Sequence, residues 1–244
     1  MNPTALYVLL VVFLATLVRS TFGFGEALFA VPLLALRIPL AVAAPLAVLL
    51  SITVAAVVVA QDFRSVHIRS AAWLLFATLF GIPLGLLLLA GGHERLLRAI
   101  LACVILTFAT YFLLGRRPPK LNEARGWLLV CGFFAGVLGG AYGMNGPPLV
   151  MYGAMRRWSP QQFRATLQGY FLPASLFGMA GYAAAGMWTA AVTRYYLLSL
   201  TGVVPAIFLG RFINRRLHGE AFLRYVYFAL AAIGVVLLAQ ALHP

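Results

Sequence analysis

Two short apolar segments decide the fold of this chain: TFGFGEALFAVPLLAL, from Thr21, and MNGPPLVMYGAM, from Met144. Each is shorter than the roughly 17 residues that a helix needs to cross a bilayer, and each contains glycine and proline. At membrane depth, irregular backbone survives only where protein buries it or where it lines a wet cavity. We therefore predict that both segments are broken helices inside a membrane protein.

The rest of the chain is apolar enough to support this interpretation. Of its 244 residues, 63% are hydrophobic and 9% are charged, whereas a soluble domain is about a quarter charged. One water-soluble core could not bury so much apolar surface. The chain is predicted to be an all-α polytopic membrane protein with about ten membrane segments. Two are the short segments, and eight are full spans at 3–19, 38–60, 71–90, 96–114, 126–142, 164–185, 189–210 and 221–242.

The two short segments occupy corresponding places in an internal repeat. The matched pairs, first half before second, are Gly23 with Gly139, Pro32 with Pro148, Glu94 with Glu220 and Arg98 with Arg224. The sequence therefore predicts two homologous halves, 1–114 and 126–244, joined by a polar linker at 115–125 in a single transmembrane domain.

The distribution of basic residues indicates whether the short segments cross the membrane. If both segments dip in and return, the 18 Lys and Arg residues divide 11 to 7 between the two sides. If both cross, 14 lie on one side, and the other side keeps only Arg37, Arg95, Arg98 and Arg194. The second distribution is the one that the positive-inside rule requires, so we adopt the crossing topology.

Five crossings in each half make the two halves antiparallel. The result is a 5+5 inverted-topology repeat with a cytoplasmic linker and with both termini on the non-cytoplasmic side. Inverted repeats with broken helices at matching positions are typical of secondary transporters, whose substrate site lies near mid-membrane where the broken helices meet.

Glu26 is the only acidic residue inside a hydrophobic run. An ionisable group at membrane depth costs on the order of 3 kcal/mol and usually faces a cavity, pairs with a partner or carries a proton. We therefore assign proton coupling to Glu26. The alternative is a structural role, in which Glu26 lies close to the cytoplasmic interface, is hydrated, and pairs with Arg19.

The second broken segment carries no charge. Its glycines free the backbone and its two prolines favour the start of a half-helix, whose positive dipole end would form an anion site. The alternative is a plain proline kink, which is compatible with a site. The candidate substrate-binding residues here are Tyr142, Gly143, Asn145, Gly146, Pro147 and Pro148.

The stretch that follows, SPQQFRATLQGYFLPAS from Ser159, begins a helix at Pro160 and then carries polar residues. Thr166, Gln168 and Tyr170 could either make interhelical hydrogen bonds or contact substrate. Gln168 is the best substrate candidate among them.

Glycines also recur at four-residue spacing elsewhere in the chain. One row is Gly132, Gly136 and Gly140, and a shorter one is Gly81 and Gly85. Such rows predict that helix backbones approach each other closely.

Several function classes lack their motifs. The four histidines lie in connections or at the terminus with no metal-ligand spacing, and the chain has no nucleotide-binding motif. For the same reason we expect neither a cofactor nor a metal. The excess of basic residues follows membrane topology, so we also expect no nucleic-acid partner. We also expect no enzymatic activity, because too few reactive groups face the interior.

The two segments FGFGEALFAVPLL and YGMNGPPLVMYG, the second followed by RATLQGYFL, resemble the TauE/SafE family of sulfite and organosulfonate exporters. The resemblance covers essentially the whole chain. It implies a transporter of small sulfur-containing or carboxylated anions in a bacterial-type inner membrane. By this resemblance the candidate site elements are Gly23, Gly25, Pro32, Gly143, Gly146, Pro147 and Pro148.

The first segment departs from the family pattern. Where many members continue with glycines after Gly25, this chain has Glu26 and Ala27. We hypothesise that Glu26 occupies the anion-favouring end of the first half-helix and that the uncharged second segment holds the substrate.

The expected function is secondary active transport of small organic or sulfur-containing anions, such as sulfite, sulfoacetate or other sulfonates, in the export direction. A passive anion channel with the same fold is the first alternative, and a membrane-embedded enzyme or assembly subunit is the second. We expect the carrier to form a homodimer, since one protomer then gives the other a scaffold to move against.

Overall fold

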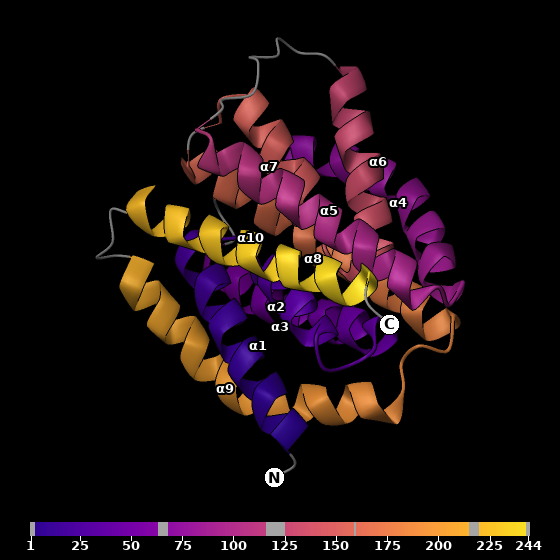
Figure 1. The fold of residues 1–244 in the computed structure, drawn as a ribbon. Coiled ribbons are helices and arrows are strands. Elements are labelled where there is room, and N and C mark those ends of the chain that lie inside the picture. Colours follow the sequence, from indigo (N-terminus) through magenta and orange to yellow (C-terminus); the bar gives the residue numbers. More distant parts are fainter. Residues whose placement is uncertain (1–2, 63–67, 116–124, 159, 215–219, 243–244) are drawn as a thin grey trace.

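The fold is a bundle of helices. The computed structural model describes residues 3–62, 68–115, 125–158, 160–214 and 220–242, and within these ranges it contains ten helices and no strand. In the first half the helices are α1 (Pro3–Phe22), α2 (Glu26–Ala35), α3 (Leu40–Asp62), α4 (Ile68–Ala90) and α5 (Glu94–Leu113). In the second half they are α6 (Arg125–Tyr142), α7 (Gly146–Met155), α8 (Pro160–Ala184), α9 (Ala190–Asn214) and α10 (Glu220–Leu242). Figure 1 shows their arrangement.

Both short segments form short helices, as predicted. α2 and α7 each contain ten residues, about half the length of their neighbours. The eight longer apolar runs also coincide with helices, to within a few residues at each end. Of the predicted linker at 115–125, residues 116–124 lie outside the described residues.

The composition of the helices is that of a polytopic membrane protein. Within the described residues, five segments are long and apolar enough to cross a bilayer: Pro3–Thr21, Leu40–Val57, Ala71–Ala90, Glu94–Leu113 and Ala190–Ile213. Many large apolar side chains point outward, among them Leu87 and Phe80, which are 69% and 63% exposed. Such a surface is stable in contact with lipid and not with water.

Four helix pairs build the bundle. α4 packs along α6, α1 along α9, α5 along α10, and α3 along α8. In Figure 1 the α1–α9 pair and the α4–α6 pair lie on opposite sides, and α5 and α10 cross the front of the view. The short helices lie inside this frame, where α2 contacts α1 and α3, α7 contacts α6, and α2 touches α7.

The glycine rows allow α4 and α6 to approach each other closely. A Cβ atom at Gly136 would overlap the Thr78 carbonyl oxygen, and one at Gly81 would overlap the Phe133 carbonyl oxygen. The prediction of close helix approach is confirmed, and the two rows face each other across one interface.

Gly136→Ala is expected to lower stability by about 1–3 kcal/mol, because the added methyl group would force two backbones apart. Gly178→Ala is the matched control. It also replaces a mid-helix glycine, but a Cβ there would meet nothing within 4 Å. We expect the control to be neutral or slightly stabilising, since alanine favours helix. Thermal unfolding of both variants in detergent measures the difference, and equal midpoints would show that the contact is not tight.

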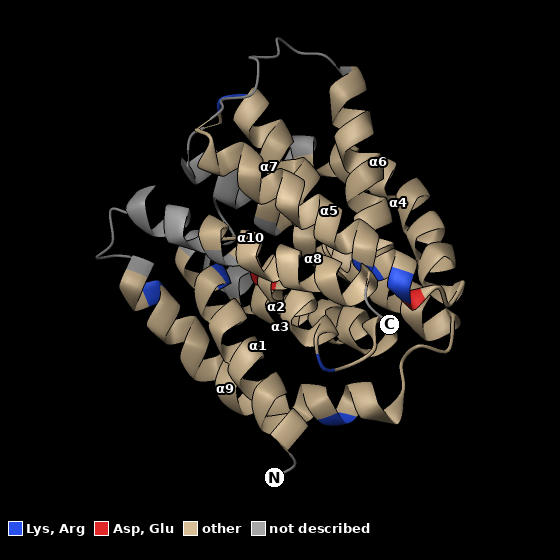
Figure 2. Cartoon of the chain, in the orientation of Figure 1, with Lys and Arg blue, Asp and Glu red and all other residues tan. Residues whose placement is uncertain are grey.

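Charged side chains are sparse on the described helices (Figure 2). Among the described residues, only Arg19 and Glu26 combine a charge with burial, being 3% and 2% exposed. These two residues flank the break between α1 and α2.

Candidate functional site

The backbone reverses at glycine at each of the two helix breaks. Gly23 and Gly25 have φ values of 83° and 98°, and Gly143 has 65°, in the left-handed region that side chains disfavour. The Gly23 N–H donates to the Arg19 carbonyl at 2.6 Å, and the Gly143 N–H to the Gly139 carbonyl at 2.8 Å. The structural counterpart of Gly23 is therefore Gly143, one helical turn beyond the Gly139 that the sequence match paired with it.

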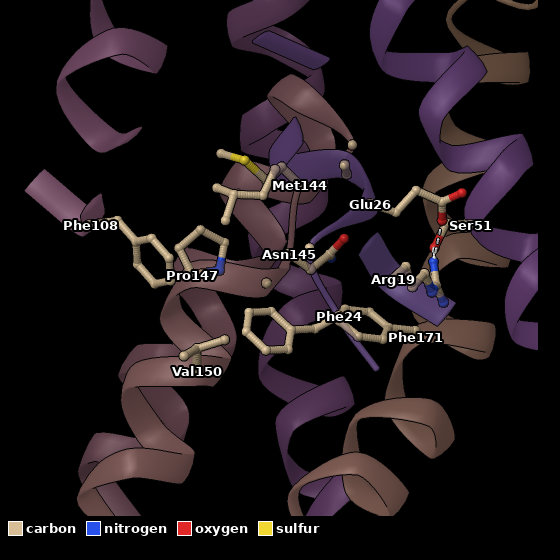
Figure 3. Close-up of a pocket in the computed structure, with 15 residues that line it drawn as sticks. Arg19, Phe24, Glu26, Ser51, Phe108, Met144, Asn145, Pro147, Val150 and Phe171 are labelled. Atoms are coloured by element: carbon tan, nitrogen blue, oxygen red, sulfur yellow. Dashed lines mark hydrogen bonds and ion pairs between the residues drawn. The ribbon is translucent and has the colours of Figure 1, made fainter. Parts of the chain in front are cut away.

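The starts of α2 and α7 line one buried cavity, whose wall is completed by residues of α1, α3, α5 and α8 (Figure 3). The volume of the cavity that the centre of a water molecule can occupy is about 20 Å³. This is enough for about one ordered water. Among the predicted site residues, those that line it are Gly25, Glu26, Gly143, Asn145, Gly146 and Pro147.

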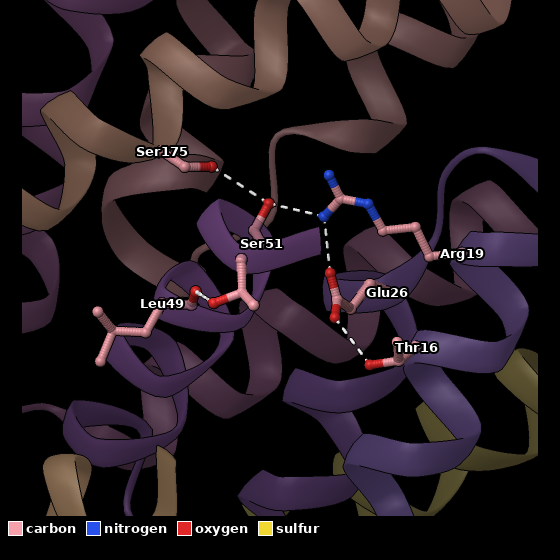
Figure 4. Close-up of polar contacts among 7 residues, drawn as sticks. Thr16, Arg19, Glu26, Leu49, Ser51 and Ser175 are labelled. Atoms are coloured by element: carbon pink, nitrogen blue, oxygen red, sulfur yellow. Dashed lines mark hydrogen bonds and ion pairs between the residues drawn. The ribbon is translucent and has the colours of Figure 1, made fainter. Parts of the chain in front are cut away.

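A buried ion pair forms part of the first-half wall of the cavity (Figure 4). The Glu26 carboxylate accepts hydrogen bonds from Arg19 Nη1 at 2.6 Å and from Thr16 Oγ1 at 3.0 Å. Arg19 Nη1 also donates to Ser51 Oγ at 2.8 Å, and the Ser175 hydroxyl donates to Ser51 Oγ at 3.2 Å. The network joins α1, α2, α3 and α8 around the break.

The environment of Glu26 agrees with one part of the structural alternative and contradicts another. Glu26 pairs with Arg19, as the structural alternative expected. The expectation of a hydrated carboxylate is wrong, because the side chain of Glu26 is only 1% exposed and that of Arg19 only 4%. The carboxylate turns toward α1, where it accepts from Arg19 and Thr16, and the N-cap residue of α2 is Gly25, which has no side chain. Helix starts of this kind leave backbone N–H groups available to an anion.

Arg19 uses only part of its hydrogen-bonding capacity. Both of its described bonds leave from Nη1, while Nε and Nη2 are buried and have no partner in the described part of the chain. The guanidinium lies 5.1 Å from the centre of the Phe171 ring. The cavity is thus lined by a fixed cation with free donors.

The second half contributes no charged side chain to the cavity lining, and its one polar side chain there is Asn145. Asn145 Nδ2 donates to the Tyr170 hydroxyl at 3.3 Å, and that hydroxyl shares a hydrogen bond of 2.7 Å with Thr78 Oγ1. Gly139 makes room for the amide, because a Cβ there would overlap Asn145 Nδ2. The Tyr170 contacts are interhelical hydrogen bonds, one of the two roles expected for the polar residues of this helix.

The start of α7 is poor in backbone donors. Pro147 and Pro148 occupy its first turn, and proline has no N–H to offer. The first turn of α2 has no proline. The donor-rich helix start is therefore that of α2, although the hypothesis from sequence assigned the substrate to the second segment.

Several other predicted residues lie away from the cavity lining. The Tyr142 hydroxyl donates to the Leu97 carbonyl at 2.9 Å, and Pro32 is buried inside α2. Gly23 and Pro148 sit next to lining residues but are not among them. The side chain of Gln168 lies outside the described residues.

Among the lining residues, Arg19, Ser51 and Phe171 were not predicted as parts of a substrate site. Arg19 was expected as a marker of topology and, in the structural alternative, as the partner of Glu26. Its distance of seven residues from Glu26, across the glycine break, was the available signal. Ser51 and Phe171 stand in apolar helices and gave none.

Comparisons with known proteins identify the family of this fold and cavity. No solved structure matches the chain. A relative from Cupriavidus necator, named "Probable sulfite/organosulfonate exporter TauE", is 26% identical over 207 residues, which cover 84% of this chain and 81% of that protein. The family model described as "Sulfite exporter TauE/SafE" matches residues 8–237. The chain therefore belongs to the TauE/SafE family.

Proposed function

We propose that the protein is a secondary active transporter that exports small sulfur-containing or organic anions, such as sulfite, sulfoacetate or other sulfonates. The observation that carries the proposal is one buried cavity, lined by the starts of both short helices and by the buried cation Arg19. Helix starts and a guanidinium both favour a bound anion. The family description and the name of the relative from Cupriavidus necator support sulfur oxyanions as the class.

The transport mechanism that we propose is alternating access by a 5+5 inverted repeat. The packing pairs support it. When the halves 1–114 and 126–244 are exchanged, α1 takes the place of α6 and α9 takes the place of α4, so the α1–α9 pair becomes the α6–α4 pair. The same exchange maps the α3–α8 and α5–α10 pairs onto themselves. The substrate site then lies at the pseudo-two-fold axis between α2 and α7, and rocking of one half against the other opens it to each side in turn.

A carrier fits the cavity better than the alternative of a passive channel. A channel needs a continuous hydrated path, whereas in this conformation the cavity holds about one water and must widen before it admits an anion such as sulfite. The aromatic rings of Phe24, Phe108 and Phe171 line it. Accumulation of the anion against its own gradient distinguishes the two, because a channel cannot produce it.

We further propose that Glu26 couples the anion to protons. Arg19 and Glu26 are the charged residues of the described cavity wall, and hydroxyl groups of Thr16 and Ser51 complete their surroundings. Protonation of Glu26 removes the negative charge beside Arg19 and so changes the affinity of the site for an anion. Binding and protonation then influence each other reciprocally.

Purified protein in liposomes tests the function directly. Vesicles loaded with unlabelled sulfite should accumulate labelled sulfite by exchange, and sulfoacetate should compete while glycerol should not. The binding counterpart is a thermal shift with sulfite, sulfoacetate, taurine and simple carboxylates, in which the anion that raises the midpoint most names the substrate class. If no anion is exchanged or bound, the transport proposal is wrong.

Cysteine labelling tests the topology. In a variant lacking Cys103 and Cys131, Arg95→Cys at the start of α5 and Arg156→Cys after α7 are expected on opposite faces of the membrane. Only the first should react with an impermeant maleimide added to intact cells, because the proposal places both termini, and the α4–α5 connection with them, on the non-cytoplasmic side. Labelling of both from outside would exclude the inverted repeat.

The remaining proposals concern the surroundings of the carrier. We propose an inner-membrane location and a homodimer, with lipid covering the rest of the outward-facing apolar side chains. Native mass spectrometry of the detergent-solubilised protein measures the oligomeric state.

A further inference from the structure

The guanidinium of Arg19 leaves three of its five N–H groups without a protein acceptor. Both bonds of Nη1 are used, by Glu26 and by Ser51, while Nε–H and the two hydrogens on Nη2 are buried and unpaired in the described part of the chain. A buried donor without an acceptor is costly. Because Arg19 lines the cavity, an acceptor bound there would satisfy these donors.

The unpaired hydrogens have the geometry of an oxyanion fork. In the planar guanidinium, Nε–H and one Nη2–H point in parallel from the same edge, and their spacing matches two oxygens of a carboxylate, sulfite or sulfonate group. A monatomic anion such as chloride offers the two N–H groups a single acceptor atom, so it cannot give each of them its own linear hydrogen bond. The edge opposite to Nη1 is therefore suited to an oxyanion.

The surroundings hold Arg19 in position. Glu26 and Ser51 fix Nη1 from one side, Ser175 donates to Ser51 from behind, and the Phe171 ring lies 5.1 Å from the guanidinium carbon. Figure 4 shows the pair and the hydroxyl groups that anchor it. Because its orientation is already set, Arg19 needs little ordering when an anion binds, which favours affinity.

We propose that the Nε–Nη2 edge of Arg19 binds the oxyanion head of the transported solute as a bidentate pair, with Glu26 on the opposite corner of the guanidinium. This inference rests on the proposed function and names the residue that recognises the substrate. It also gives Glu26 a second role, because its negative charge competes with the anion for Arg19. Removing that charge should strengthen anion binding, whereas removing the fork should weaken it.

The test is anion binding to the purified full chain. Calorimetry measures the affinity for sodium sulfite and for methanesulfonate in a background of sodium chloride. Arg19→Lys keeps the positive charge but loses the fork, so its affinity for both oxyanions should fall by about tenfold or more. Arg98→Lys is the matched control. It alters the other described ion pair, with Glu94 at 2.9 Å, whose residues do not line the cavity, and its affinity should be unchanged.

Glu26→Gln keeps the proposal testable if Arg19→Lys does not fold. The amide can still accept from Arg19 Nη1, but it carries no charge, so both oxyanions should bind about tenfold more tightly. Unchanged or weaker binding in Glu26→Gln would overturn the inference, as would wild-type affinity in folded Arg19→Lys. Competition by chloride as strong as that by sulfite would also overturn it. In these three cases sulfite still binds and the proposed function stands, whereas a wild-type protein that binds no anion refutes both.

Discussion

Glu26→Gln is expected to abolish anion transport driven by a pH gradient while leaving anion exchange intact. The amide is close in shape to the carboxylate. It can still accept a hydrogen bond from Arg19 and form a hydrogen bond with the Thr16 hydroxyl. It cannot carry a proton between the two sides of the membrane. Gradient-driven flux in proteoliposomes should therefore fall to the background of protein-free vesicles. Exchange of internal for external sulfite needs no net proton movement and should continue.

The control for this prediction is Glu94→Gln. Glu94 also pairs with an arginine, but its side chain is 43% exposed, it accepts a hydrogen bond from the Leu40 N–H, and it does not line the cavity. Both kinds of flux should survive its replacement. If Glu26→Gln retained full gradient-driven flux, Glu26 would not be the coupling group. If it lost exchange as well, the residue would be required for conformational change itself.

The helices could be predicted because the bilayer imposes their length. A span needs roughly 20 apolar residues, and each of the eight long runs met that limit closely enough to be located to within a few residues. The two breaks could be predicted equally well, since a short apolar segment that contains both glycine and proline is typical of a broken helix at membrane depth. The residue-by-residue alignment of the two halves was predicted less well. The prolines aligned Gly23 with Gly139, whereas the backbone reversal aligns it with Gly143.

The cavity was only partly predictable because its charged wall depends on side-chain direction across a break. An uninterrupted helix would place Arg19 and Glu26 two turns apart on one face. The turn at Gly23 and Gly25 instead folds the start of α2 back beside α1, so that the two side chains meet at 2.6 Å. Ser51 and Phe171 reach the cavity from α3 and α8, through packing that no local pattern specifies. Local motifs thus identified the helix starts, and tertiary packing supplied the cation and its neighbours.

Removing one member of the buried pair is expected to destabilise the protein far more than removing both. Arg19→Met leaves Glu26 buried without its cation, a situation that costs about 3–5 kcal/mol in proteins. Glu26→Leu should cost a similar amount, because it leaves Arg19 uncompensated among apolar side chains. The double variant Arg19→Met/Glu26→Leu replaces the pair with side chains of similar volume, and such replacements are often neutral or stabilising. Its stability should therefore return to near the wild-type value.

Thermal unfolding of the four proteins in the same detergent completes a double-mutant cycle, in which the coupling between the two sites appears as the departure from additivity. Transport gives the complementary readout. The double variant should fold and yet neither bind nor exchange sulfite, because it has lost the guanidinium fork. The Arg19–Glu26 pair would then be retained for transport and not for stability. A double variant as unstable as either single one would place the pair among the structural requirements of the fold, and a stable double variant that still exchanged sulfite would remove the anion site from Arg19.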